Sequence, residues 1–195
     1  MGGDSARRAW RTRALTLMAL LAGAAGWQAG DTPAAEDGAT LEHRVKAAFL
    51  YKIAGYVEWP AGASPKADTP FTIGVLGAEA LAAELSRTVQ GRTVHNRPIT
   101  VAQVKAGGPL EGLHVLFVGR EQRNRLKDVV AKTRPHPVLV VTEWDGALAE
   151  GGMVNFVLVD GRVRFEVALE AARRAGLTPS SRLLAVAQQV YSGTP

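Results

Sequence analysis

The chain has 195 residues, of which 47% are hydrophobic and 21% are charged; it carries a formal net charge of +5 and no cysteine. These values are typical of a globular protein with one sizeable core, and they exclude a largely disordered chain. The absence of cysteine excludes disulfide bonds, thiol catalysis and cysteine-based zinc sites.

The first 24 residues have the layout of a cleavable export signal. Arginines precede an uncharged run from Ala14 to Ala25, and the small residues 22–24 provide an A-x-A-like cleavage site. An uncleaved anchor helix would need about 20 apolar residues. We therefore predict a signal peptide over 1–24, exported by the general secretory or the twin-arginine route. Its removal takes away four arginines and one aspartate, which lowers the net charge from +5 to +2. The basicity is therefore no sign of nucleic-acid binding.

The next segment, 25–40, is small and polar and is predicted to be a flexible tether. From Leu41 to Tyr56, apolar residues recur at steps of three and four, which predicts an amphipathic helix that ends before Pro60. Strand and helix patterns then alternate, and this indicates parallel strands joined by right-handed crossovers. The predicted strands are 71–76, 99–104, 114–118 and 137–142, and the predicted helices are 78–89 and 121–132.

The C-terminal third begins with a predicted β-hairpin, 153–159 and 162–167, because Asp160–Gly161 is a strong two-residue turn signal. A short helix is predicted over 168–174, and a last helix is predicted to begin at Thr178 and run to Val190. We expect one domain over 41–192. Its fold class is α/β, a three-layer domain with a mostly parallel twisted sheet, a C-terminal antiparallel hairpin and helices on both faces. No second apolar stretch is long enough to span a bilayer.

The sequence contains no pattern typical of a catalytic, cofactor or metal site. The four histidines lack metal-ligand spacing, and His114 opens an apolar strand, which favours a buried structural role. Glycines 74 and 77 suit either a tight strand-to-helix turn or an anion cradle, and the turn is the simpler interpretation. The basic helix 121–132 has no interleaved aromatic residues for base stacking, so it is interpreted as a solvated face. A hydrolase that uses Glu58 or His114 is the least favoured hypothesis.

Ordered strings across the chain resemble the YfiR-like family of periplasmic proteins, and they extend from Val45 to Val190. The strings that carry this resemblance are Val45–Tyr51 with Val57–Pro60, Phe71–Gly77, His114–Val118, Gly151–Phe156 with Arg164–Val167, and Ala171–Leu177 with Ser180–Leu184.

The resemblance implies a non-catalytic periplasmic regulator without a cofactor. Its expected partner is the periplasmic sensor domain of an inner-membrane diguanylate cyclase, whose restraint keeps cyclic-di-GMP and biofilm output low, and a homodimer is also implied. Family members often carry a cysteine where this chain has Leu113, so sensing through thiols is not available here. Lys52 and Gly55 also differ from the residues usual in the opening helix.

Five residues are candidates for binding the partner. Glu58 and Trp59 lie at a predicted helix end, where Trp59 either anchors a partner or closes the core. Arg162, Arg164 and Glu166 lie on the polar face of the hairpin, either at an interface or simply in solvent. The alternative function is a periplasmic protein that binds a small ligand or a cell-wall fragment near Gly77 and Gly119, at the carboxyl ends of the predicted strands.

Overall fold

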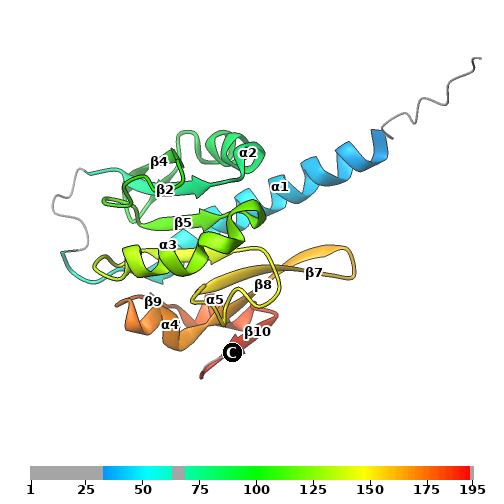
Figure 1. Ribbon diagram of the computed structural model, residues 1–195. Helices are drawn as coiled ribbons and strands as arrows, with labels where there is room; N and C mark the ends of the chain where they lie inside the picture. The colour runs from blue at the N-terminus through cyan, green and yellow to red at the C-terminus, as the bar shows by residue number, and fades with distance from the viewer. Residues whose placement is uncertain (1–32, 63–68, 194–195) are drawn as a thin grey trace, which may run out of the picture. The chain divides into compact units, whose positions relative to one another are not determined.

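An eight-stranded sheet in the order β10-β8-β7-β6-β5-β2-β4-β3 forms the centre of the fold in the computed structural model, which describes residues 33–62 and 69–193 (Figure 1). The expected signal peptide lies outside the described residues. By its internal contacts the chain divides into two units, Met1–Ala35 and Glu36–Pro195, and all the strands belong to the second. The strands are β2 (Phe71–Leu76), β3 (Thr93–Val94), β4 (Arg97–Val104), β5 (Val115–Val118), β6 (Leu139–Thr142), β7 (Val154–Val159), β8 (Arg162–Ala168) and β10 (Gln189–Tyr191).

The five strands from β4 through β2, β5 and β6 to β7 are parallel, as their apolar, β-branched sequences predict. β8 returns antiparallel to β7 through the turn Asp160–Gly161, whose residues both have positive φ as a type I′ turn requires. β10 adds in parallel to β8, and β3 pairs antiparallel with the first two residues of β4. The prediction of an α/β fold with a mostly parallel sheet and a C-terminal hairpin is confirmed.

Helices cover both faces of this sheet. Helix α1 (Pro33–Gly55) packs Phe49 against Phe156 and Phe165, at ring-centroid distances of 6.2 and 5.5 Å, and α2 (Glu79–Val89) follows β2. On the other face lies α3 (Leu126–Thr133), which continues the 3₁₀ helix η1 (Arg120–Arg125). Figure 1 shows α3 in front of the sheet and α1 behind it. The core lies between these layers, and its largest fully buried side chains include Phe71, Phe117, Leu50 and Leu139.

Helix α1 begins earlier than expected, because the segment Pro33–Thr40 is helical where a tether was predicted. Proline suits the first position of a helix, and the alanines that follow it are strong helix formers, so only Gly38 opposes the helix. Among the helices that the structure describes, none is long and apolar enough to cross a membrane.

The prediction of a single closing helix from Thr178 to Val190 was wrong. Thr178–Pro179 forms β9, which pairs antiparallel with β1 (Val57–Glu58), and α5 (Ser181–Ala185) is only five residues long. The N-cap is Ser180, whose hydroxyl accepts a hydrogen bond from the Leu183 N–H. Pairing with β1 and β8 outweighs the helical preference at the two ends of this segment. The preceding helix, α4 (Leu169–Arg174), agrees with its predicted range to within one residue.

Candidate functional site

A cleft of about 700 Å³ lies beyond the carboxyl ends of β2, β5 and β6, and we call it the carboxyl-end cleft. This end of a parallel sheet is where open α/β folds bind ligands. Side chains of α1, the β2–α2 turn, the start of η1, the residue after β6 and the β7–β8 hairpin contribute to it. The lining residues are Ala39, Glu42, His43, Lys46, Gly77, Ala78, Glu79, Ala80, Arg120, Glu121, Arg123, Glu143 and Leu158.

Two glycines bring the loops of this cleft into close contact. Gly77 has a φ of +66°, which a side chain would strain. The Gly119 N–H donates to the Leu76 carbonyl at 2.8 Å, and a Cβ atom at position 119 would lie 2.1 Å from the Gly77 carbonyl oxygen. The interpretation of Gly77 as a tight turn agrees with this geometry. The glycine pair therefore fixes how closely the loops after β2 and β5 approach each other.

Lys46 is the buried centre of the cleft's charges, with only 4% of its surface exposed. Its ammonium group contacts the Glu143 carboxylate at 2.5 Å and also the Glu42 carboxylate one helical turn away. The Glu143 carboxylate accepts a hydrogen bond from the Arg120 backbone N–H at 3.0 Å, and the Glu143 carbonyl accepts one from the Arg120 guanidinium at 3.1 Å. These bonds tie α1 to the ends of β5 and β6, because burying an ammonium group requires such partners.

Charges of both signs face the cleft. Besides the group around Lys46, it is lined by the cationic Arg120 and Arg123 and by the acidic Glu79 and Glu121. Such a lining suits charged or zwitterionic polar groups rather than an apolar ligand. Among the described residues, no group of three histidine, cysteine or acidic side chains could hold a metal ion.

A second cluster surrounds His114 at the opposite, amino end of the sheet. His114 is 4% exposed; its Nδ1 accepts the Thr72 N–H at 3.2 Å, and its Nε2 lies 3.1 Å from the Arg97 guanidinium. Burial, and then the positive charge of Arg97, lower the pKa of His114 to about 4. The ring stacks on Phe71 with a centroid distance of 4.5 Å. The structure therefore places His114 in the core with polar partners, as the sequence predicted.

The structure does not gather the five predicted partner-binding residues into one site. Trp59 is half-buried; its indole N–H donates to the Pro137 carbonyl at 2.9 Å, and its ring meets Phe71 edge-on at 5.1 Å, so Trp59 helps to close the core. Glu58, its neighbour in β1, is exposed. Both lie at the amino end of β6, because Pro137 precedes that strand.

The other three lie on β8. Arg162 and Arg164 are exposed and pair with Val159 and Val157 of β7, and Arg162 lies beyond the carboxyl end of β6. Glu166 is half-buried and accepts a hydrogen bond from the Tyr191 hydroxyl at 3.4 Å, and its charge raises the pKa of that hydroxyl.

Sequence reasoning placed the alternative ligand site near Gly77, which lines the carboxyl-end cleft, but it missed the charged side chains of that cleft. Lys46 and Glu143 are 97 residues apart, and no local pattern predicts their contact. The spacing of Glu42 and Lys46 at i and i+4 was a signal for an ion pair on one helix face. Leu158 in the hairpin is 57% exposed, although an apolar residue of a strand is expected to face the core. The neighbouring residues in the sequence do not indicate this exposure.

The chain is an α/β protein with a mostly parallel sheet and a cleft beyond the carboxyl ends of its strands. Two solved structures are similar in fold: the ABC domain from Streptococcus pneumonia in complex with L-Trp (TM-score 0.53) and a conserved domain protein from Vibrio cholerae (TM-score 0.52). Each of the two is 12% identical to this chain. Each alignment covers 76% of this chain and 60% of the solved chain. No curated protein sequence matches the chain.

The model of the YfiR/HmsC-like family matches residues 43–188, and the chain belongs to this family. The family is a regulatory, periplasmic one, and it is associated with the control of diguanylate cyclases. The match covers α1 from His43 through α5, so it includes the β7–β8 hairpin and the lining of the carboxyl-end cleft except Ala39 and Glu42. The resemblance inferred from the sequence strings is confirmed.

Proposed function

We propose that this protein is a non-catalytic periplasmic regulator that binds the periplasmic sensor domain of an inner-membrane diguanylate cyclase and restrains it. The observation that carries the proposal is the family match over 43–188. Export by a cleavable signal peptide over 1–24 is part of the proposal, since it places the protein in the compartment of the sensor domain. Lower cyclic-di-GMP and reduced biofilm output follow from the restraint.

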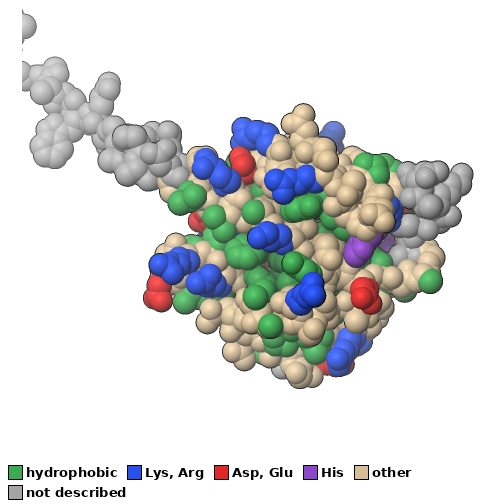
Figure 2. Space-filling view, turned by 180° about the vertical axis from the view of Figure 1, so that it is seen from behind, with side chains coloured by type: hydrophobic (Ala, Val, Ile, Leu, Met, Phe, Trp, Pro, Cys, Tyr) green, Lys and Arg blue, Asp and Glu red, His purple; other side chains and the backbone are tan. Residues whose placement is uncertain are grey.

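The β7–β8 hairpin is the proposed contact surface. Its tip presents Leu158 on one side of the ribbon and Arg162 and Arg164 on the other. Arginine is one of the residue types enriched at protein interfaces, so the side of the ribbon that carries Arg162 and Arg164 is the proposed contact face. On the face seen in Figure 2, hydrophobic side chains gather between Lys and Arg side chains, and few acidic side chains lie among them. An acidic sensor-domain surface with an apolar centre would complement this face.

Restraint requires that the protein bind the inactive receptor more tightly than the active one. A hundredfold drop in cyclase activity corresponds to a preference of about 2.7 kcal/mol at saturation. A few lost contacts at the hairpin would remove most of that preference. The proposal also includes a homodimer, and sedimentation of the purified protein tests it, since a monomer at micromolar concentration would contradict it.

The decisive experiment compares the parent protein with the double charge reversal R162E/R164E. Deletion of the gene should raise cyclic-di-GMP, and the parent protein should co-purify with a membrane cyclase from a detergent extract. The double variant should neither lower cyclic-di-GMP in the deletion strain nor co-purify with the cyclase. R134E, a matched charge reversal of an exposed arginine just after α3, should do both, as the parent does. Unchanged cyclic-di-GMP after deletion, together with no cyclase in the extract, would refute the proposal. Full activity of the double variant would refute the hairpin as its contact surface.

A second candidate function is favoured by the carboxyl-end cleft: binding of a small charged ligand or a cell-wall fragment. The buried Lys46 and the acidic groups around it could hold a zwitterionic group. Because one of the two solved structures is a complex with L-Trp, amino acids belong in the set of test ligands. A ligand that raises the melting temperature of the parent protein, but not that of K46M, would support this function. If no periplasmic metabolite shifts the melting temperature, the candidate fails.

A further inference from the structure

A second cavity, which we call the α3 pocket, lies between α3 and the loop that follows β4. Its volume is about 280 Å³. Its apolar lining comes from three different elements of the fold, namely Leu76 at the end of β2, Leu110 in the loop before β5 and Val129 of α3. All three side chains are at most 7% exposed, so they present a fixed apolar surface.

Three cations surround this apolar surface. Arg125 and Lys132 are seven residues apart in the continuous η1–α3 segment, so they lie on the same side of it, two turns apart. Lys105 stands across from them at the end of β4. Asp128 is the single acidic side chain of the lining, which gives the pocket a formal charge of +2.

None of these four side chains takes part in an ion pair within the described part of the chain. The ion pairs there join Lys46, Arg87 and Arg173 to glutamates. All four side chains are exposed, so they can turn toward a ligand at little cost. The pocket therefore combines an apolar surface with cations that form no ion pair within the described residues.

We propose that the α3 pocket binds a small organic anion, a molecule with one acidic group and a compact apolar body. The apolar lining disfavours a bare inorganic anion, which would lose hydration without replacing it. The cations disfavour a neutral or cationic molecule of the same shape. A volume at the lower limit of ligand pockets, which begin at about 300 Å³, excludes a nucleotide or a folded peptide segment.

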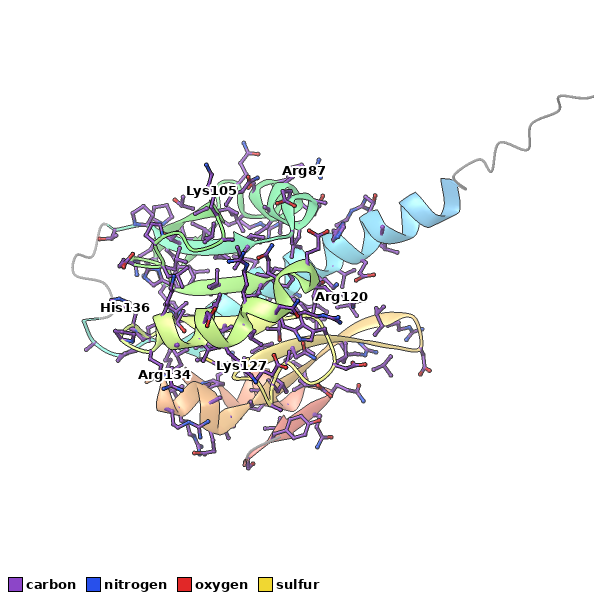
Figure 3. The ribbon with its side chains drawn as sticks, in the orientation of Figure 1. Arg87, Lys105, Arg120, Lys127, Arg134 and His136 are labelled. Carbon is purple, nitrogen blue, oxygen red and sulfur yellow. The ribbon has the colours of Figure 1, made fainter. Side chains whose placement is uncertain are left out.

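This site is separate from the carboxyl-end cleft, because the two cavities share no lining residue. Variants can therefore distinguish them. Figure 3 shows Lys105 on one side of α3 and Lys127 on the other. Lys127 is an exposed cation of the same helix that does not line the α3 pocket, and it offers a matched control. Arg120 offers a control for binding in the cleft.

The test is a fluorescence titration with two probes of similar shape, anionic 8-anilinonaphthalene-1-sulfonate and neutral N-phenyl-1-naphthylamine. We expect one site for the anionic probe and about tenfold weaker binding of the neutral one. R125Q and K132Q should each weaken binding of the anionic probe about threefold, and the double variant about tenfold. K127Q and R120Q should bind it as the parent does. R125Q, K132Q and K127Q should keep the parent's melting temperature, since the changed side chains are exposed.

Four results would overturn the proposal. The first is no binding of the anionic probe up to millimolar concentration. The second is equal binding of the two probes, which would show that charge does not contribute. The third is a double variant that binds within twofold of the parent. The fourth is an equal loss in R120Q, which would place the probe in the carboxyl-end cleft instead. None of these results bears on the proposed restraint of a cyclase, which is measured by cyclic-di-GMP and co-purification.

Discussion

Replacing Glu143 by glutamine tests whether the buried ion pair holds α1 against the ends of the strands. One Glu143 carboxylate oxygen contacts the Lys46 ammonium at 2.5 Å, and the other accepts the Arg120 N–H at 3.0 Å. In glutamine one of these two oxygens becomes an NH2 group, which donates, so one of the two donors loses its acceptor. The substitution leaves a buried cation with Glu42 as its remaining partner.

The expected loss in the free energy of unfolding is about 2 kcal/mol. Removing one partner of a fully buried ion pair costs about 3–5 kcal/mol, but Glu42 still offsets part of the charge of Lys46. For a domain of this size, a loss of about 2 kcal/mol lowers the melting temperature by about 6 °C. It shifts the midpoint of urea unfolding by about 1 M.

Urea unfolding of the parent, E143Q, K46M, E42Q and the double variant K46M/E143Q measures this effect. The Glu42 side chain is 32% exposed and that of Glu143 is 15% exposed, so E42Q should cost only about 0.5 kcal/mol. The double variant should recover at least about 1 kcal/mol of the sum of its single losses, because the uncompensated ammonium is gone. Equal losses for E143Q and E42Q, or strict additivity in the double variant, would refute the reasoning.

Three further predictions concern other parts of the fold. G119A should destabilise the domain by about 3 kcal/mol in urea unfolding, because its Cβ would lie 2.1 Å from the Gly77 carbonyl oxygen. G55A is the matched control, because the φ of Gly55 is not positive and a Cβ there would meet no atom within 4 Å. Because the pKa of His114 is lowered to about 4 in the folded protein, only the unfolded chain binds a proton at this residue between pH 6.5 and 4. The full stability is therefore present above pH 6.5, and the free energy of unfolding falls by about 2 kcal/mol from pH 7 to pH 5. The same fall in H114Q would contradict the assignment to His114. W59F should lower the free energy of unfolding by about 1–2 kcal/mol, because the Pro137 carbonyl would lose the hydrogen bond from the indole N–H. An unchanged midpoint of urea unfolding would contradict this role of Trp59.

The central sheet could be predicted from the sequence because its strands carry strong local signals. The strand at Leu139–Thr142 is β-branched and apolar, and the hairpin turn Asp160–Gly161 has both residues in the backbone region that this turn requires. Such signals depend only on neighbouring residues. They survive folding because the tertiary packing demands the same conformation.

The elements that were missed form through distant pairing. β1 and β9 are two residues long each and pair across more than 100 positions of the chain, so neither has a pattern of its own. The same holds for the site: the contact of Lys46 with Glu143 joins α1 to the end of β6. The α3 pocket likewise combines Leu76 with Val129. Each of these is a consequence of strand order, which hydrophobic periodicity does not specify.

The short β3 strand has a consequence for how the protein behaves at high concentration. It pairs only with Arg97 and Pro98, so in the described chain the remaining six residues of β4 form an edge of the sheet without a further strand. Exposed edges can template the addition of a strand from another molecule. Here Lys105, directly after the uncovered part of β4, limits such growth, since lysine resists burial. Replacing Lys105 by threonine would remove this protection, and we expect the purified protein to form β-rich aggregates on storage.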